Sequence, residues 1–172
     1  MEKQLPAGSL LLAGLPATSK SSFGNWLEEN KGYFHLDFDE EDIIQGRGFG
    51  QAQDRLWHHE DATPLWDGIV ARHQPIVLTW GFAPQFLPLV KQLLTWGFVP
   101  AWFTASRAAS RRAVIKRGGI DVKYFDRYIE LLQPIEAEVA VVFGRNVLQT
   151  LHDDGSRPSF DAIYEQVSSW FV

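Results

Sequence analysis

The chain has 172 residues, of which 45% are hydrophobic and 22% are charged. These proportions are ordinary for a globular protein and exclude a collagen-like, coiled-coil or largely unfolded chain. The formal net charge of −5 disfavours nucleic acid as a partner, and the absence of cysteine excludes disulfides, cysteine-based zinc sites and thiol nucleophiles. No apolar run approaches the ~20 residues of a membrane-spanning helix. We therefore expect one cytoplasmic domain over residues 1–172.

Apolar runs alternate with amphipathic segments along the chain, and this alternation is typical of strands and helices that build a parallel sheet. The first run, 9–13, predicts a buried strand that Gly14 ends. Further strands are predicted over 33–37, 75–82, 98–105 and 138–143, with 147–151 as a further candidate that would pair with the fifth. Helices are predicted over 21–30, 41–73 (broken near 46–50 and 63–64), 88–96, 106–117, 121–132 and 160–171. The predicted fold is an α/β three-layer sandwich with a mostly parallel five-stranded sheet.

The turn after the first predicted strand has the composition of an anion-binding loop. It reads Gly14-Leu15-Pro16-Ala17-Thr18-Ser19-Lys20-Ser21, and a predicted helix follows it. A tight loop at a helix N-terminus directs several backbone N–H groups inward, where they can bind phosphate oxygens. The alternative is an ordinary turn rich in small residues. The strand before the turn and the helix after it favour the phosphate loop.

This turn resembles the phosphate-binding loop of P-loop kinases, G-x-x-x-x-G-K-[ST], except that Ser19 stands where that pattern has its second glycine. The group it resembles is the small-molecule and zeta-toxin-like kinases, which includes shikimate, gluconate and chloramphenicol phosphotransferases. The resemblance implies ATP and Mg²⁺ as ligands. Lys20 would contact the β- and γ-phosphates, and the Ser21 hydroxyl would ligate Mg²⁺. The nucleotide-binding residues of the loop would be Gly14, Pro16, Ala17, Thr18, Ser19, Lys20, Ser21 and Ser22.

Two acids, Asp37 and Asp39, lie where the second predicted strand ends. Ligands of open α/β sheets bind at the carboxyl ends of the strands. The resemblance implies that Asp39 orients or deprotonates the acceptor hydroxyl and that Asp37 holds Mg²⁺ through its water shell. The alternative is a solvated acidic helix start, which the helix dipole favours. The third predicted strand carries no acid where related kinases often have one, so the metal site would depend on Asp37 and Asp39.

A basic segment over 106–120 follows the fourth predicted strand and resembles the lid of P-loop kinases. Arg107 and Arg111 lie four residues apart and share one helix face. From there they would stabilise the transferring phosphoryl group, and Arg111 would also bind the nucleotide. The alternative is a solvated basic surface helix. After the predicted fifth strand, Arg145 falls where such kinases bind adenine.

The segment 43–74, between the second and third predicted strands, falls where these kinases cover the acceptor. Its aromatic and arginine residues would suit a ring-bearing or anionic acceptor, and they would equally suit a packed cap. The predicted function is an ATP-dependent phosphotransferase that acts on a hydroxyl of a small molecule. Two alternatives stay open, namely a nucleotide or polynucleotide-end kinase, and a nucleotide-binding module without transfer activity.

Overall fold

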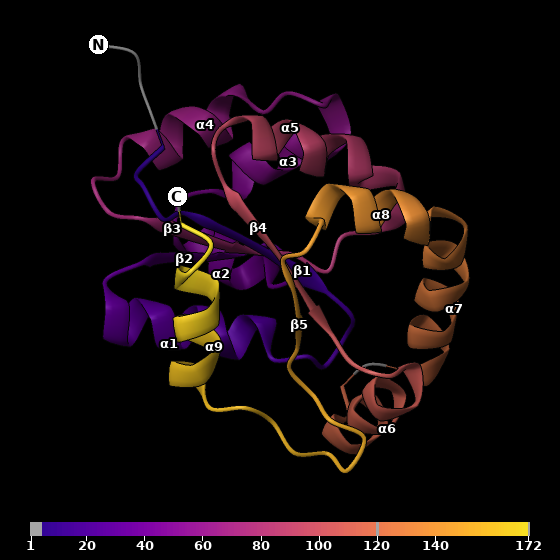
Figure 1. Ribbon diagram of the computed structural model, residues 1–172. Helices are drawn as coiled ribbons and strands as arrows, with labels where there is room; N and C mark the ends of the chain where they lie inside the picture. Colours follow the sequence, from indigo (N-terminus) through magenta and orange to yellow (C-terminus); the bar gives the residue numbers. More distant parts are fainter. Residues whose placement is uncertain (1–4, 120, 172) are drawn as a thin grey trace.

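The computed structural model describes residues 5–119 and 121–171, and in these residues five strands form one sheet (Figure 1). The strands lie in the order β2-β3-β1-β4-β5, and every neighbouring pair is parallel. The predicted α/β fold with a parallel five-stranded sheet is confirmed. Because all strands run the same way, their carboxyl ends meet at one edge. The strands are β1 Leu10–Gly14, β2 Phe34–Asp37, β3 Ile76–Thr79, β4 Val99–Thr104 and β5 Val147–Gln149.

Helices cover both faces of the sheet, with α1 and α9 on one face and α3, α4, α5 and α8 on the other (Figure 1). None of the helices in the described ranges is both long and apolar enough to span a membrane. The helices are α1 Lys20–Lys31, α2 Glu41–Gly46, α3 Gly50–His59, α4 Thr63–Val70, α5 Leu87–Thr95, α6 Arg107–Arg117, α7 Val122–Leu132, α8 Glu136–Phe143 and α9 Phe160–Ser168, with short 3₁₀ turns at Pro84–Phe86 and Gln133–Ile135.

The position of β1 in the middle of the sheet explains why its apolar residues form an unbroken run. Successive side chains of a strand point to opposite faces, and a parallel sheet is covered on both. Leu10 and Leu12 pack into the cluster with α1 and α9, whereas Leu11 and Ala13 pack into the cluster on the other face. All four side chains are fully buried. The strand therefore needs no polar alternation, and it delivers the turn that follows to the middle of the carboxyl edge.

The strand predicted over 138–143 is wrong, because these residues belong to helix α8. Val139 and Phe143 are buried, while Val141 between them is 82% exposed. A strand would place all three side chains on one face, whereas a helix brings only residues four apart together. A short run rich in valine fits either structure by composition alone. The fifth strand is Val147–Gln149, and it pairs with β4.

Candidate active site

The turn after β1 is held against the neighbouring strand by a close backbone approach at Gly14. Gly14 has φ 138°, and a Cβ atom there would lie 1.9 Å from the Phe103 carbonyl oxygen. The next amide, that of Leu15, donates a hydrogen bond to the same oxygen at 3.1 Å. No side chain fits at position 14, so the chain must leave the sheet through a glycine.

The loop itself contains two non-glycine residues in the left-handed region, Ala17 at φ 59° and Ser19 at φ 71°. Ser19 is the residue that caps α1, and it occupies the position where the P-loop pattern has glycine. Two hydroxyls hold the loop's backbone from within and from α6. Thr18 Oγ1 donates to the Leu15 carbonyl at 2.6 Å, and Ser110 Oγ donates to the Pro16 carbonyl at 2.5 Å. The loop is therefore a fixed turn at the N-terminus of a helix, where amide N–H groups lack intrahelical acceptors.

Lys20 begins α1 and lies almost entirely buried beneath the loop. Its ammonium group donates to the carbonyl oxygens of Gly14 at 3.1 Å and Leu15 at 2.8 Å. Burial lowers the Lys20 pKa below its ordinary value, although the charges of Asp39 and Asp37 act in the opposite direction. Among the described residues the ammonium group contacts backbone carbonyls and forms no ion pair, so no carboxylate there neutralises this buried charge directly.

A cavity of about 630 Å³ opens above the loop. Seven of the eight predicted loop residues line it, and Gly14 does not, because it lies behind them against β4. The wall opposite the loop is built by the ends of β2 and β3 and by α6, α7 and the turn between them. The lining residues are Pro16, Ala17, Thr18, Ser19, Lys20, Ser21, Ser22, Asp39, Glu40, Gly81, Arg117, Gly118, Gly119, Tyr124, Phe125 and Tyr128.

Asp39 faces this cavity from the turn after β2. Its Oδ2 accepts a hydrogen bond from the Gly81 amide at 2.6 Å, which links the ends of β2 and β3. The cavity walls remove water from around the carboxylate and raise the Asp39 pKa, while Lys20 and the Gly81 amide oppose that rise. The Tyr128 hydroxyl is buried near this charge and has no hydrogen-bond partner within 5–119 and 121–171, and burial and Asp39 both raise its pKa.

Asp37 is buried at the end of β2 and carries one unsatisfied oxygen. Its Oδ1 accepts from the Asp39 amide at 3.0 Å, whereas Oδ2 has no hydrogen-bond partner among the described residues. The described residues contain no group of three or more His, Asp or Glu side chains arranged to hold a metal. Mg²⁺ is bound in proteins by one or two oxygen ligands and keeps several waters. Ser21 lines the cavity and Asp37 does not, but both carry oxygen donors of the kind that Mg²⁺ takes, and one Asp37 oxygen is unsatisfied.

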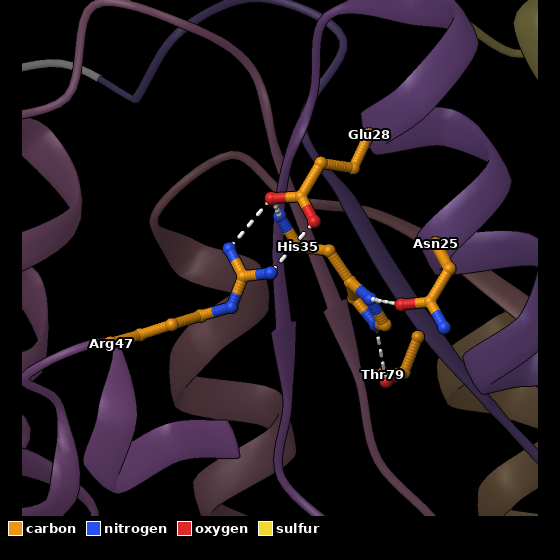
Figure 2. Close-up of polar contacts among 5 residues, drawn as sticks. All are labelled: Asn25, Glu28, His35, Arg47 and Thr79. Carbon is orange, nitrogen blue, oxygen red and sulfur yellow. Dashed lines mark hydrogen bonds and ion pairs between the residues drawn. The ribbon is translucent and has the colours of Figure 1, made fainter.

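The end of β3 carries a polar network that sequence reasoning missed (Figure 2). His35 Nδ1 lies 2.8 Å from Asn25 Oδ1, and His35 Nε2 lies 2.9 Å from Thr79 Oγ1. With the Asn25 oxygen accepting, Nδ1 carries the proton and Nε2 accepts from the threonine hydroxyl. Burial lowers the His35 pKa, which favours this neutral ring. Thr79 thus stands at the end of the acid-free third strand with its hydroxyl already engaged.

Several solved structures are similar to this chain in fold. A gluconokinase from Sinorhizobium meliloti 1021 matches at TM-score 0.57 and 16% identity, over 98% of this chain and 93% of its own. A shikimate kinase from Acinetobacter baumannii, solved with shikimate, matches at TM-score 0.55 and 15% identity, over 97% and 93%. A shikimate kinase from Bacteroides thetaiotaomicron matches at TM-score 0.53 and 13% identity, over 95% and 93%. The sequence itself matches no family model and no curated protein.

The chain has the fold of the P-loop small-molecule kinases. Its structural neighbours are kinases of this group and align with it over nearly the whole length. The expectation drawn from the loop Gly14–Ser21 is confirmed at the level of the fold.

The lid arginines predicted from the sequence lie away from the cavity. Arg107 forms an ion pair with Glu136, and Arg111 forms two hydrogen bonds with Asp126, at 2.8 and 3.0 Å. Arg117, at the end of the same basic helix, lines the cavity. Within 5–119 and 121–171 Arg117 makes no ion pair. The basic run in the sequence includes Arg117. Only the orientation of the helix shows that Arg117, rather than Arg107 or Arg111, lines the cavity. Residue 120, the last of the predicted lid, lies outside the described residues.

The prediction that Arg145 binds the nucleotide was tied to the misassigned strand over 138–143, and Arg145 is not among the residues that line the cavity. With β5 at Val147–Gln149, Arg145 precedes the strand and lies at the amino edge of the parallel sheet, opposite the loop. The carboxyl edge is reached instead by the segment 150–159. That segment contributes Arg157, which donates to Ser19 Oγ at 2.5 Å and to the Ala17 carbonyl at 2.9 Å. Nothing in the sequence near Arg157 indicated this contact.

The segment 43–74 packs on the sheet and contributes no described residue to the lining of the cavity. Arg47 makes two hydrogen bonds with Glu28, at 2.6 and 2.7 Å (Figure 2). Arg55 pairs with Asp61, and the Arg72 guanidinium lies 4.1 Å from the centre of the Phe34 ring. Aromatic residues of the segment pack against rings of neighbouring elements: Trp57 stacks with Trp80 and with Phe86, and Trp66 meets Trp96 at an interplanar angle of 52°. The packed-cap interpretation describes these side chains.

Proposed function

We propose that this chain is an ATP-dependent phosphotransferase that moves the γ-phosphoryl group of ATP to a hydroxyl of a small molecule. The observation that carries the proposal is one cavity with a buried cation on one wall and a carboxylate on the other. Lys20 lies under a loop at a helix N-terminus, and Asp39 faces the same space from the end of β2. Phosphoryl transfer depends on positioning and on charge stabilisation, and these two walls supply both.

The loop and the cations around it have distinct roles in this proposal. The amides of the loop and the Lys20 ammonium would bind the phosphates, with the positive end of the α1 dipole favouring their charge. Ser21 and Asp37 would hold Mg²⁺, which, when bound, neutralises charge on the β- and γ-phosphates. Arg117, which lines the cavity and has no acidic partner in the part of the chain that the structure describes, would add the second protein cation on the γ-phosphate. Arg107 and Arg111 would have to release their acidic partners to act there.

Asp39 would act on the acceptor. Its carboxylate accepts a hydrogen bond from the acceptor hydroxyl and takes its proton as the oxygen attacks the γ-phosphorus. The new bond joins the acceptor oxygen to phosphorus, and the bond from phosphorus to the β–γ bridging oxygen breaks, so that ADP leaves. The Gly81 amide fixes the orientation of the carboxylate by holding one of its oxygens.

The charges of the cavity favour an acceptor without a negative charge. Asp39 and Glu40 line the acceptor side, and Tyr124, Phe125 and Tyr128 supply aromatic surface. The arginines of 43–74 that the sequence offered for an anionic acceptor are engaged by acids or stacked on rings. We therefore favour a neutral, hydroxyl-bearing acceptor with a ring. Such an ATP-consuming reaction belongs in the cytoplasm, where ATP is supplied.

The test is a transfer assay with γ-labelled ATP and Mg²⁺ across four acceptor classes. These are neutral hydroxyl compounds with and without rings, the matching sugar and cyclohexane acids, free nucleosides and nucleotides, and an oligonucleotide with a 5′-hydroxyl. Label should appear in a neutral acceptor and disappear in the Asp39→Asn variant. Label in the nucleotides or the oligonucleotide alone would replace the proposal with the nucleotide-kinase alternative. ATP binding without transfer to any class would identify a binding module.

A further inference from the structure

One guanidinium contacts both strained residues of the phosphate loop. Arg157 donates through Nη1 to the Ser19 hydroxyl at 2.5 Å and through Nη2 to the Ala17 carbonyl at 2.9 Å. Ala17 and Ser19 are the loop's two non-glycine residues with positive φ, at 59° and 71°. A left-handed backbone costs free energy for a residue with a Cβ, and such conformations persist only where the surroundings impose them.

The segment that presents Arg157 is itself tied to the loop and to the lid helix. Thr150 Oγ1 donates to the Thr18 carbonyl at 2.7 Å, which joins the end of β5 to the loop. The Ser106 hydroxyl bonds the Asp153 carboxylate, and Arg112 donates to the Asp153 carbonyl at 2.8 Å. Arg157 therefore reaches the loop from an anchored backbone. Little conformational entropy is lost when its two hydrogen bonds to the loop form.

The arrangement compensates for the departure of this loop from the P-loop pattern. Glycine at position 19 would adopt φ 71° without strain and would need no brace. Serine brings a Cβ that disfavours the conformation, and it also brings a hydroxyl that can be held. The guanidinium fork supplies two parallel N–H donors, which suits it to grip a side-chain oxygen and a backbone oxygen two residues apart.

We propose that Arg157 is a positioning residue that holds the phosphate loop in its binding conformation by bracing Ala17 and Ser19. The proposal rests on the proposed function for its consequence in ATP binding, but the brace itself is a property of the ligand-free protein. Arg157 acts through the loop backbone, and its role should become dispensable when position 19 can adopt the conformation unaided. The dependence of the loop on Arg157 should therefore vanish in large part in a Ser19→Gly background.

The experiment is a double-variant cycle of the wild type, Ser19→Gly, Arg157→Ala and the double variant. Arg157→Lys keeps the charge and loses the fork. Arg127→Ala, an exposed arginine on α7 paired with Glu130, is the control. Amide hydrogen exchange over 15–22 is measured without nucleotide, ATP affinity by calorimetry with Mg²⁺ present, and melting temperature on every variant.

Arg157→Ala should raise exchange in the loop and weaken ATP binding about tenfold, as expected from the loss of hydrogen bonds to a charged group. Arg157→Lys should behave like Arg157→Ala. The double variant should recover at least threefold of that loss, because glycine removes the strain that the brace opposes. The control should match the wild type in all three measurements.

Three results would overturn the brace. Unchanged loop exchange in Arg157→Ala would show that the contact holds nothing. A double variant as weak as Arg157→Ala would show that Arg157 binds the nucleotide itself. Full retention in Arg157→Lys would assign the effect to charge rather than to the fork. If the wild type fails to bind ATP, the proposed function fails, while the exchange measurement still decides the brace.

Discussion

The loop region 14–22, with Asp37 near it, and the segment 43–74 both carry charged side chains, and they differ in how those charges are paired. Within the described residues, Lys20 has only backbone carbonyls as hydrogen-bond partners, and one buried oxygen of Asp37 accepts no hydrogen bond. In the segment, Arg47 and Arg55 are matched by carboxylates. The comparison teaches that residue type alone does not tell which charged groups the fold leaves without a charged partner.

We expect the largest effect from a change at Asp39. Asp39→Asn keeps the shape of the side chain but removes its charge and its ability to take a proton. Transfer should fall about 10²–10⁴-fold, while ATP affinity measured by calorimetry should stay within a factor of about three. Transfer at the wild-type rate in the variant would mean that the acids after β2 only form the solvated start of a helix and take no part in transfer.

The pH profile sharpens the assignment to Asp39. Because the cavity raises the Asp39 pKa, the carboxylate is protonated at higher pH than an ordinary aspartate, whose pKa is about 3.9. The acid limb of kcat/KM should therefore have its midpoint above that value, and activity should decline as pH falls through it. Asp39→Asn should lose this limb. An unchanged limb in the variant would assign it to another group.

Lys20→Ala tests the other wall of the cavity. Transfer should fall about 10²–10³-fold because the ammonium stabilises charge that develops on the phosphoryl group. ATP affinity should fall less, since the loop amides still bind the phosphates. Single-turnover kinetics beside calorimetry separate the two losses. An equal loss in both would mean that Lys20 contributes to ground-state binding only.

Arg117→Ala asks whether the α6 cation that lines the cavity acts there. Transfer should fall about tenfold, the loss expected for one charge-assisted contact of ~1.4 kcal/mol. The matched control is Lys116→Ala, which removes the neighbouring exposed cation and should change the rate less than twofold. Equal effects of the two variants would show that α6 contributes only general positive charge.

The smallest effect on chemistry is expected from the segment 43–74. Arg47→Ala should lower the free energy of unfolding at neutral pH by about 1–3 kcal/mol, because two hydrogen bonds to a half-buried carboxylate are lost. The rate of transfer per folded molecule should be unchanged. Arg55→Ala, which breaks an exposed pair, should cost at most about 1 kcal/mol. A lower transfer rate per folded molecule in Arg47→Ala would indicate that this segment takes part in the reaction.

The loss in Arg47→Ala should also depend on pH. Burial acts to raise the Glu28 pKa, but the hydrogen bonds from Arg47 and from the His35 amide lower it below its ordinary value. A carboxylate with a lowered folded pKa stabilises the protein above its unfolded pKa of about 4.3, and that stability is lost as pH falls through the folded pKa. Urea unfolding at pH 7 and near pH 4 should show the difference between wild type and variant shrink in acid.

Local patterns predicted most of the fold and the loop. The apolar run that ends at Gly14, the turn after it and the acids after β2 are adjacent in sequence, and their structure follows from neighbours. The strand prediction for 138–143 failed because a valine-rich run fits a strand or a helix by composition, and only the burial pattern in the structure distinguishes the two. The expectation that Arg145 follows the fifth strand depended on that assignment, and Arg145 precedes β5 instead. Arg157 could not be found, because its partners Ala17 and Ser19 are 140 and 138 residues away along the chain.

The bonds that join the end of β5 to the loop also set an order for biosynthesis. Thr150 and Arg157 hold Thr18, Ala17 and Ser19, yet the ribosome makes the loop first and these anchors last. A nascent chain can form β1 to β4 before residue 157 has emerged, and its loop then lacks the brace. Nucleotide binding should therefore mature late in translation, and stalled chains that end before residue 150 should capture little ATP.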